Sequence, residues 1–149
     1  MDLRVLLIGC FLGVGLYDCS GDVDYTPPAG STEMAVTQYS FGKMVVDGTE
    51  YTSDIVISSG RIIKSWSFDT ASHIIEPDDV VNRVTADIST IIIGTGYHSA
   101  ASFSTPAMAL FDEMREKGIE VFVLSTAAAV RRFNESAKSG LLVFFHLNC

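Results

Sequence analysis

Hydrophobic and polar positions divide the chain into three parts. Residues 39–68 alternate between apolar and polar side chains, a period typical of strands with one buried face. From residue 80 onward, three segments with apolar residues at helical spacing are each followed by a short apolar run. Before residue 34 neither period is present, and Ser, Gly and Pro recur. The pattern predicts a leader and flexible linker over 1–33 and a single α/β domain over 34–149.

The first part of the domain is predicted to be a β-meander. Its three strands cover residues 39–46, 50–57 and 61–68. Asp47-Gly48 separates the first two strands, and a two-residue reverse turn of this kind needs positive φ, which Asp and Gly tolerate. Ser58-Ser59-Gly60 separates the second strand from the third. A sheet with one buried face follows from this arrangement.

Three helices alternate with three strands in the second part. The helix starts are marked by Pro77, by Thr105 as N-cap before Pro106, and by Thr126 as N-cap. The helix ends are marked by Lys117-Gly118 and Gly140. The strands cover residues 89–94, 119–124 and 141–147. Connections of this length favour parallel neighbours and right-handed crossovers, so these strands should form a helix-covered sheet that the meander extends or packs against.

Composition and charge narrow the class of protein. A chain of 149 residues is the usual size of one domain, and 48% apolar against 19% charged residues excludes a wholly disordered protein. The formal net charge is −8, and the basic residues form no stripe able to neutralise several phosphates. We therefore expect no nucleic-acid partner.

The cysteines and the leader bear on localisation. Cys10 and Cys19 lie in the leader and Cys149 is the last residue of the sequence, which favours reduced thiols in the cytoplasm over a disulfide framework, with a bridge from Cys19 to Cys149 as the alternative. Residues 5–17 are uncharged, too few to span a bilayer and similar in length to a signal-peptide core. Membrane association or export is thus expected only through residues 1–17, as the alternative to a cytoplasmic protein.

The Gly94-Thr95-Gly96 loop is the first candidate for a binding site. It follows a buried strand, and ligands of α/β folds bind at the carboxyl ends of strands. A dinucleotide interpretation fails on three counts: Ser99 replaces the third glycine of the motif, the next helix begins only near Thr105, and no acid ends the following strand. A structural turn that needs flexible backbone, another small ligand and a partner contact remain open.

Titratable side chains offer few further candidates. His98 follows the buried strand and could move a proton, with Asp54 as its acid-base companion if the meander packs against the loop. On a strand, His146 and Cys149 would point to opposite faces, so a shared zinc ion would require the chain to curl. We predict no catalytic residues, no metal site and no cofactor, and we name Gly94, Thr95, Gly96, His98 and Asp54 as the candidate ligand or partner loop.

Several short motifs together resemble a known family. They are Tyr39-Ser40-Phe41-Gly42, Val46-Asp47-Gly48, Tyr51-Thr52-Ser53-Asp54, Trp66, Ile92-Ile93-Gly94-Thr95-Gly96, Gly118-Ile119-Glu120-Val121, Ala129-Val130, Phe133-Asn134 and His146-Leu147-Asn148-Cys149. From about residue 36 to 149 the chain resembles a small family of largely uncharacterised proteins that includes the mammalian adipogenesis-associated domain protein and the mitochondrial assembly factor 3 of respiratory complex I. The family ending often has a hydroxyl residue where this chain has Asn148. The sequence of residues 97–104 does not match the family, so no partner can be inferred from this loop.

The resemblance implies a fold and a kind of function. The implied fold is a three-layer α/β domain with a central mixed sheet, in which an N-terminal β-meander is followed by αβαβαβ. No catalytic activity or cofactor is established for the family, whose members look like assembly or scaffold proteins. We therefore expect a non-enzymatic protein-interaction domain with protein partners, assisting assembly of a membrane or respiratory complex. The alternative is a small-molecule-binding domain or weak enzyme that uses the Gly94-Thr95-Gly96 loop.

Overall fold

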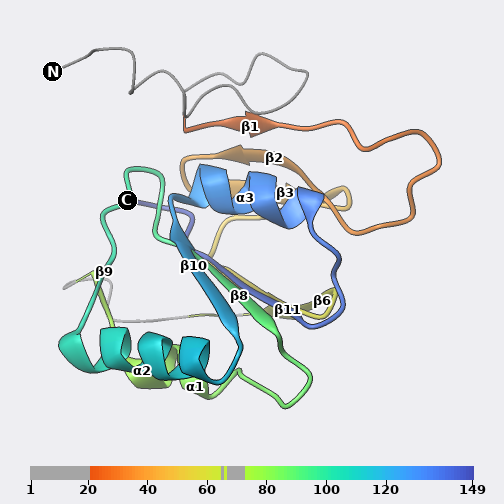
Figure 1. The fold of residues 1–149 in the computed structure, drawn as a ribbon. Coiled ribbons are helices and arrows are strands. Elements are labelled where there is room, and N and C mark those ends of the chain that lie inside the picture. Colours follow the sequence, from red (N-terminus) through yellow and green to blue (C-terminus); the bar gives the residue numbers. More distant parts are fainter. Residues whose placement is uncertain (1–20, 65, 67–72) are drawn as a thin grey trace, which may run out of the picture.

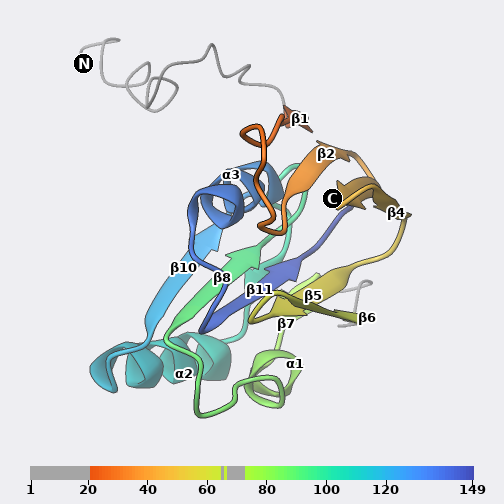
Figure 2. The same ribbon diagram turned by 90° about the vertical axis from the view of Figure 1, so that its right-hand side faces the viewer.

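A central mixed sheet of five strands organises the domain (Figures 1 and 2). The computed structural model describes residues 21–64, 66 and 73–149, so the predicted leader, Cys10 and Cys19 lie outside the described residues. The strands in spatial order are β10 (Glu120–Leu124), β8 (Thr90–Gly94), β11 (Leu141–Phe145), β5 (Ile55–Ser58) and β6 (Arg61–Lys64). β8 pairs in parallel with β10 and β11, whereas β5 pairs antiparallel with β11 and β6. The predicted α/β fold with a mixed sheet is confirmed.

A second, antiparallel sheet comes from the first part of the domain. Its strands in order are β1 (Val23–Asp24), β2 (Val36–Ser40), β3 (Lys43–Val46) and β4 (Thr49–Tyr51). The Asp47-Gly48 turn is present, with positive φ at both residues. The strand predicted over 39–46 is instead divided, because the chain reverses at Phe41 and at Gly42, whose φ is 73°.

The strand predicted over 50–57 is wrong in a more informative way. It is divided between β4 in the second sheet and β5 in the central sheet. The meander therefore neither simply extends the central sheet nor simply packs beside it, but contributes strands to both. The third predicted strand is observed as β6, and its predicted end at residues 67–68 lies outside the described residues.

A short strand occurs where the sequence predicts a linker. In β1, Val23 pairs with Tyr39 and Asp24 with Gln38, and the side chain of Val23 is only 8% exposed. Two residues are too few to display a period of two, so the pattern carries no signal for this strand. The ordered domain thus includes residues from the segment before residue 34.

Helices cover the central sheet on both faces. α3 (Thr126–Glu135) lies with the second sheet on one face, and α1 (Pro77–Val81) and α2 (Thr105–Glu116) lie on the other (Figure 1). Successive residues of β11 alternate between the two cores: Val143 and Phe145 pack toward α3, and Leu142 and Phe144 toward α2. This alternation explains the unbroken apolar run of β11, since a strand covered on both faces has no polar side. The three-layer arrangement follows.

Two smaller features complete the fold. β7 (Ile74–Ile75) and β9 (Ser102–Phe103) pair in parallel beside the main sheet, and neither strand is among the elements predicted from the sequence. No helix in the described ranges is both long and apolar enough to cross a bilayer.

The helix caps differ from the predicted ones by one residue. Ser104 and Ser125 are the N-caps of α2 and α3, and their hydroxyl oxygens accept hydrogen bonds from Ala107 N and Ala128 N. Thr105 and Thr126 are instead the first helical residues. Because Ser125 supplies the cap, the hydroxyl of Thr126 is available for contacts with other loops.

Candidate functional site

Three segments meet at the carboxyl ends of β8, β10 and β11, which are parallel neighbours in the central sheet. Thr126 joins them: its hydroxyl donates a hydrogen bond to His146 O (2.6 Å) and accepts one from Gly96 N (2.9 Å). The Thr126 N–H donates in turn to Gly96 O at 3.1 Å. The hydroxyl is fully buried, so it satisfies one donor and one acceptor that have no access to water. The start of α3 thereby fixes both the glycine loop and the C-terminal segment.

The glycine loop is closed by its own hydrogen bonds. All four N–H groups of residues 95–98 donate within the domain. The acceptors are Leu124 O for Thr95, Thr126 Oγ1 for Gly96, Asn148 O for Tyr97 and Cys149 O for His98. A phosphate cradle needs such N–H groups directed at the ligand, and here they are already used. The geometry favours the structural-turn interpretation, and a ligand at this loop stays a prediction.

Close packing explains the two glycines of this loop. A Cβ on Gly94 would lie 2.9 Å from Thr126 Oγ1 and 3.1 Å from its Cα. A Cβ on Gly96 would lie 2.4 Å from Asn148 O and 2.9 Å from the carbonyl carbon of Cys149. Gly96 also has a φ of 114°, which few side chains allow. Both glycines therefore permit the loop to approach α3 and the C-terminal segment.

Asp54 lies beside the same C-terminal segment. Its Oδ2 is 2.6 Å from Nδ1 of His146, and its Oδ1 accepts a hydrogen bond from the Leu147 N–H at 2.8 Å. Asp54 follows β4 at the point where the chain leaves the second sheet for the central one. The structure thus pairs Asp54 with His146 rather than with His98, the companion suggested by the sequence.

His98 is exposed and belongs to an aromatic cluster, which we define as Phe41, Tyr97 and His98. The ring of Tyr97 meets the ring of His98 edge to face at 4.9 Å and that of Phe41 at 5.7 Å. Phe41 lies in the turn between β2 and β3 and is 56% exposed. The aromatic cluster joins two segments that are more than fifty residues apart, and its existence could not be predicted from either segment alone.

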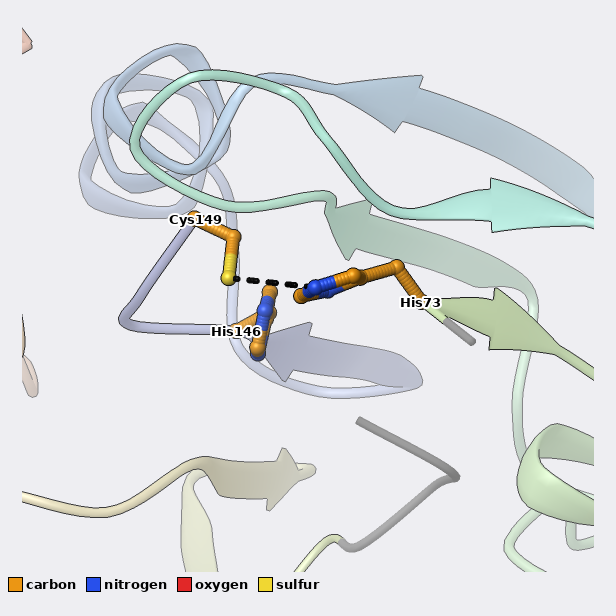
Figure 3. Close-up of side chains that lie close together, drawn as sticks. All are labelled: His73, His146 and Cys149. Carbon is orange, nitrogen blue, oxygen red and sulfur yellow. Dashed lines mark hydrogen bonds between the residues drawn. The ribbon is translucent and has the colours of Figure 1, made fainter. Parts of the chain in front are cut away.

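A second cluster comprises His73, His146 and Cys149 (Figure 3). One ligand atom from each of the three lies within 4.8 Å of the others, and Cys149 Sγ is 3.8 Å from His73 Nε2. The strand predicted over 141–147 is too long, since β11 ends at Phe145, and the chain then curls, which is the condition under which His146 and Cys149 can lie together. A strand period no longer applies beyond that point.

His73 is a companion of these residues that sequence reasoning misses. It precedes β7, and its carbonyl accepts a hydrogen bond from Ser102 N at 2.8 Å, which joins it to the edge of β9. The parallel pairing of β7 with β9 is a contact between distant segments, and each strand has only two residues. No periodic signal in the sequence could therefore place His73 beside the C-terminal segment.

Tyr39 supports the C-terminal segment from the second sheet. Its hydroxyl donates a hydrogen bond to Leu147 O at 3.1 Å, and the same oxygen accepts from Gly42 N at 2.9 Å. Burial raises the pKa of Tyr39 well above its usual range, because the phenolate would lose solvation. The segment that carries His146 is thus held from Asp54 and Tyr39 as well as from Thr126.

Known structures and a family model agree with this fold. The conserved hypothetical protein PH1505 from Pyrococcus horikoshii OT3 is 24% identical, covers 78% of this chain and 100% of its own, and superposes with a TM-score of 0.66. An outer membrane protein from Bartonella henselae is 19% identical over 78% of this chain and 97% of its own, with a TM-score of 0.60. A Mth938-like domain from Bordetella pertussis is 17% identical, covers 83% of this chain and 91% of its own, and superposes with a TM-score of 0.51. The model of a protein family of unknown function matches residues 36–147. The chain therefore belongs to the family described as protein of unknown function (DUF498/DUF598).

Proposed function

We propose that the domain is a non-enzymatic interaction module that binds a protein partner through the aromatic cluster. The exposed ring of Phe41 is the observation that carries this proposal, because a large apolar side chain at a turn gains most when a partner covers it. Aromatic residues are enriched among those that dominate binding energy at protein interfaces. The rings of Tyr97 and His98 flank Phe41 and would complete the contact.

The backbone beneath the aromatic cluster supports this role. Gly42 and His98 both donate N–H hydrogen bonds to the C-terminal segment, at 2.9 Å to Leu147 O and 2.7 Å to Cys149 O. The two loops that present the rings are therefore fixed before any partner arrives. A preformed surface loses little conformational entropy on binding, which favours affinity.

The family that the sequence resembles suggests the class of partner. We infer a protein subunit that is itself being assembled into a membrane or respiratory complex. Such a subunit exposes apolar surface until it reaches its final neighbours, and an exposed aromatic cluster suits that surface.

Affinity capture with cross-linking in cells tests the proposal. The full chain would be compared with a Phe41→Ser/His98→Ala variant and with Met108→Ser, a control that removes an apolar side chain of similar exposure from α2. We expect specific partners to be lost with the double variant and retained with the control, and binding of the purified partner to weaken at least tenfold. Equal recovery of the same partners by all three proteins would contradict the proposal, provided that circular dichroism shows all three folded.

A further inference from the structure

We propose that His73, His146 and Cys149 form a binding site for Zn²⁺ or a similar divalent metal ion. Two imidazoles and one thiol are the ligand types that Zn²⁺ prefers, and they come together here from two distant parts of the chain. This site is separate from the proposed protein contact, since none of its three residues belongs to the aromatic cluster. It would add a metal ion to a domain for which the sequence predicts none.

The hydrogen bond that His146 donates to Asp54 prepares this histidine to bind a metal. A carboxylate at 2.6 Å from Nδ1 favours the tautomer in which Nδ1 carries the proton and Nε2 carries the lone pair, and Nε2 is then the nitrogen that would bind a metal. Histidines that bind metals usually donate their second N–H to a carboxylate or carbonyl in this way. Asp54 is itself held by the Leu147 N–H, so both the carboxylate and the ring have fixed orientations.

His73 and Cys149 supply the other two donors. Nε2 of His73 faces the thiol at 3.8 Å, and Nδ1 of His73 is buried without a hydrogen-bond partner among the described residues. Tetrahedral zinc with bonds of about 2.0 Å to nitrogen and 2.3 Å to sulfur separates its ligand atoms by about 3.3–3.6 Å. The donor atoms lie within 4.8 Å of one another, so rotations of the partly buried His73 and Cys149 side chains that move their donors by about 1.5 Å or less would bring all three to zinc-binding distances.

Burial and accessibility suit reversible binding. His146 is 2% exposed, whereas His73 and Cys149 are half-buried and give an ion a route from solvent. Cys149 would bind as the thiolate and release its proton to solvent. Three protein ligands leave a fourth position for water. The bound ion would link the C-terminal segment to the residue before β7.

Titration of the metal-free full chain with Co²⁺ and Zn²⁺ tests this site. We expect one equivalent of Co²⁺ to produce a thiolate-to-cobalt charge-transfer band. Zn²⁺ should displace the Co²⁺ and abolish the band, and it should raise the unfolding temperature. Cys149→Ser should abolish the band, and His73→Gln should weaken binding at least tenfold. A Cys10→Ser/Cys19→Ser variant should keep the band, which excludes the two leader thiols as its source.

Two further variants separate a metal site from a merely structural contact. Asp54→Asn should retain the cobalt–thiolate band but weaken Zn²⁺ binding about 10- to 100-fold, as expected for a residue that positions a ligand. His98→Ala, which removes an exposed histidine outside the cluster, should bind as the wild type does. The absence of a stoichiometric band in the wild type, or Zn²⁺ binding that survives both Cys149→Ser and His73→Gln, would overturn the proposal.

Discussion

Asp54 and His146 are separated by 92 positions in the chain, yet a carboxylate oxygen of Asp54 lies 2.6 Å from the imidazole of His146. The pair joins the crossing between the two sheets to the segment after β11. Because the other oxygen of Asp54 accepts from Leu147 N, one side chain fixes both the ring and the backbone of that segment.

Asp54→Ala should lower the free energy of unfolding by about 2–6 kcal/mol. The substitution removes the carboxylate that accepts from the Leu147 N–H and from Nδ1 of His146, and each such loss costs about 1–3 kcal/mol. Denaturant unfolding followed by tryptophan fluorescence measures the change. Asp24→Ala, which removes an exposed carboxylate from β1, is the control and should leave the free energy nearly unchanged. Equal effects of the two substitutions would refute the assigned role of Asp54.

Thr126→Val should destabilise the domain by about 2–3 kcal/mol, although valine has nearly the same shape. The change removes the hydroxyl that donates to His146 O and accepts from Gly96 N, so two buried polar groups each lose a hydrogen bond. Thr126→Ser keeps the hydroxyl and should recover most of the loss. Chemical denaturation of the three proteins decides, and a valine variant as stable as the wild type would contradict the bridging role.

Gly96→Ala should be far more damaging than Gly30→Ala. Both glycines have positive φ, so both substitutions carry a backbone penalty of about 1–2 kcal/mol. A Cβ at Gly30 meets nothing within 4 Å, whereas one at Gly96 would lie 2.4 Å from Asn148 O. Thermal unfolding should show a small decrease in Tm for Gly30→Ala and a decrease several times larger for Gly96→Ala. Similar decreases would show that the C-terminal segment does not pack on the loop as described.

Tyr39 should make stability fall at alkaline pH. Burial places the folded-state pKa of Tyr39 above the unfolded value near 10, so above pH 10 the unfolded chain releases a proton that the folded protein keeps. The stabilisation is complete below pH 10 and decreases as pH rises, by up to about 1.4 kcal/mol per pH unit for one proton. Denaturant unfolding from pH 8 to 11 should show a shallower decrease for Tyr39→Phe than for the wild type. Parallel pH profiles would disprove the assignment to Tyr39.

Local chemistry accounts for the elements that the sequence predicts well. The apolar run before Gly94 forms β8, Pro77 begins α1, and Asp47-Gly48 makes the expected turn. Each of these signals depends on a residue's own backbone preference or on burial of both faces of a strand. Local patterns therefore suffice for the αβαβαβ order.

The candidate site can be predicted only in part, because its contacts join distant segments. Gly94-Thr95-Gly96 is recognisable from its place after a buried strand, and Asp54 is recognisable as a carboxylate near a turn. The partner of Asp54 cannot be predicted, because the chain passes from one sheet to the other between β4 and β5. No hydrophobic periodicity in the sequence indicates that change of sheet. His73 likewise reaches the C-terminal segment through the β7–β9 pairing alone.

The position of β11 also constrains the order in which the domain can form. β11 is the last strand along the chain, yet it lies between β8 and β5 in the central sheet. During synthesis, the facing edges of β8 and β5 are complete long before the strand that joins them leaves the ribosome. The nascent chain therefore carries two unpaired, apolar strand edges until residues 141–145 have emerged and can pair with both, and unpaired strand edges of this kind favour aggregation.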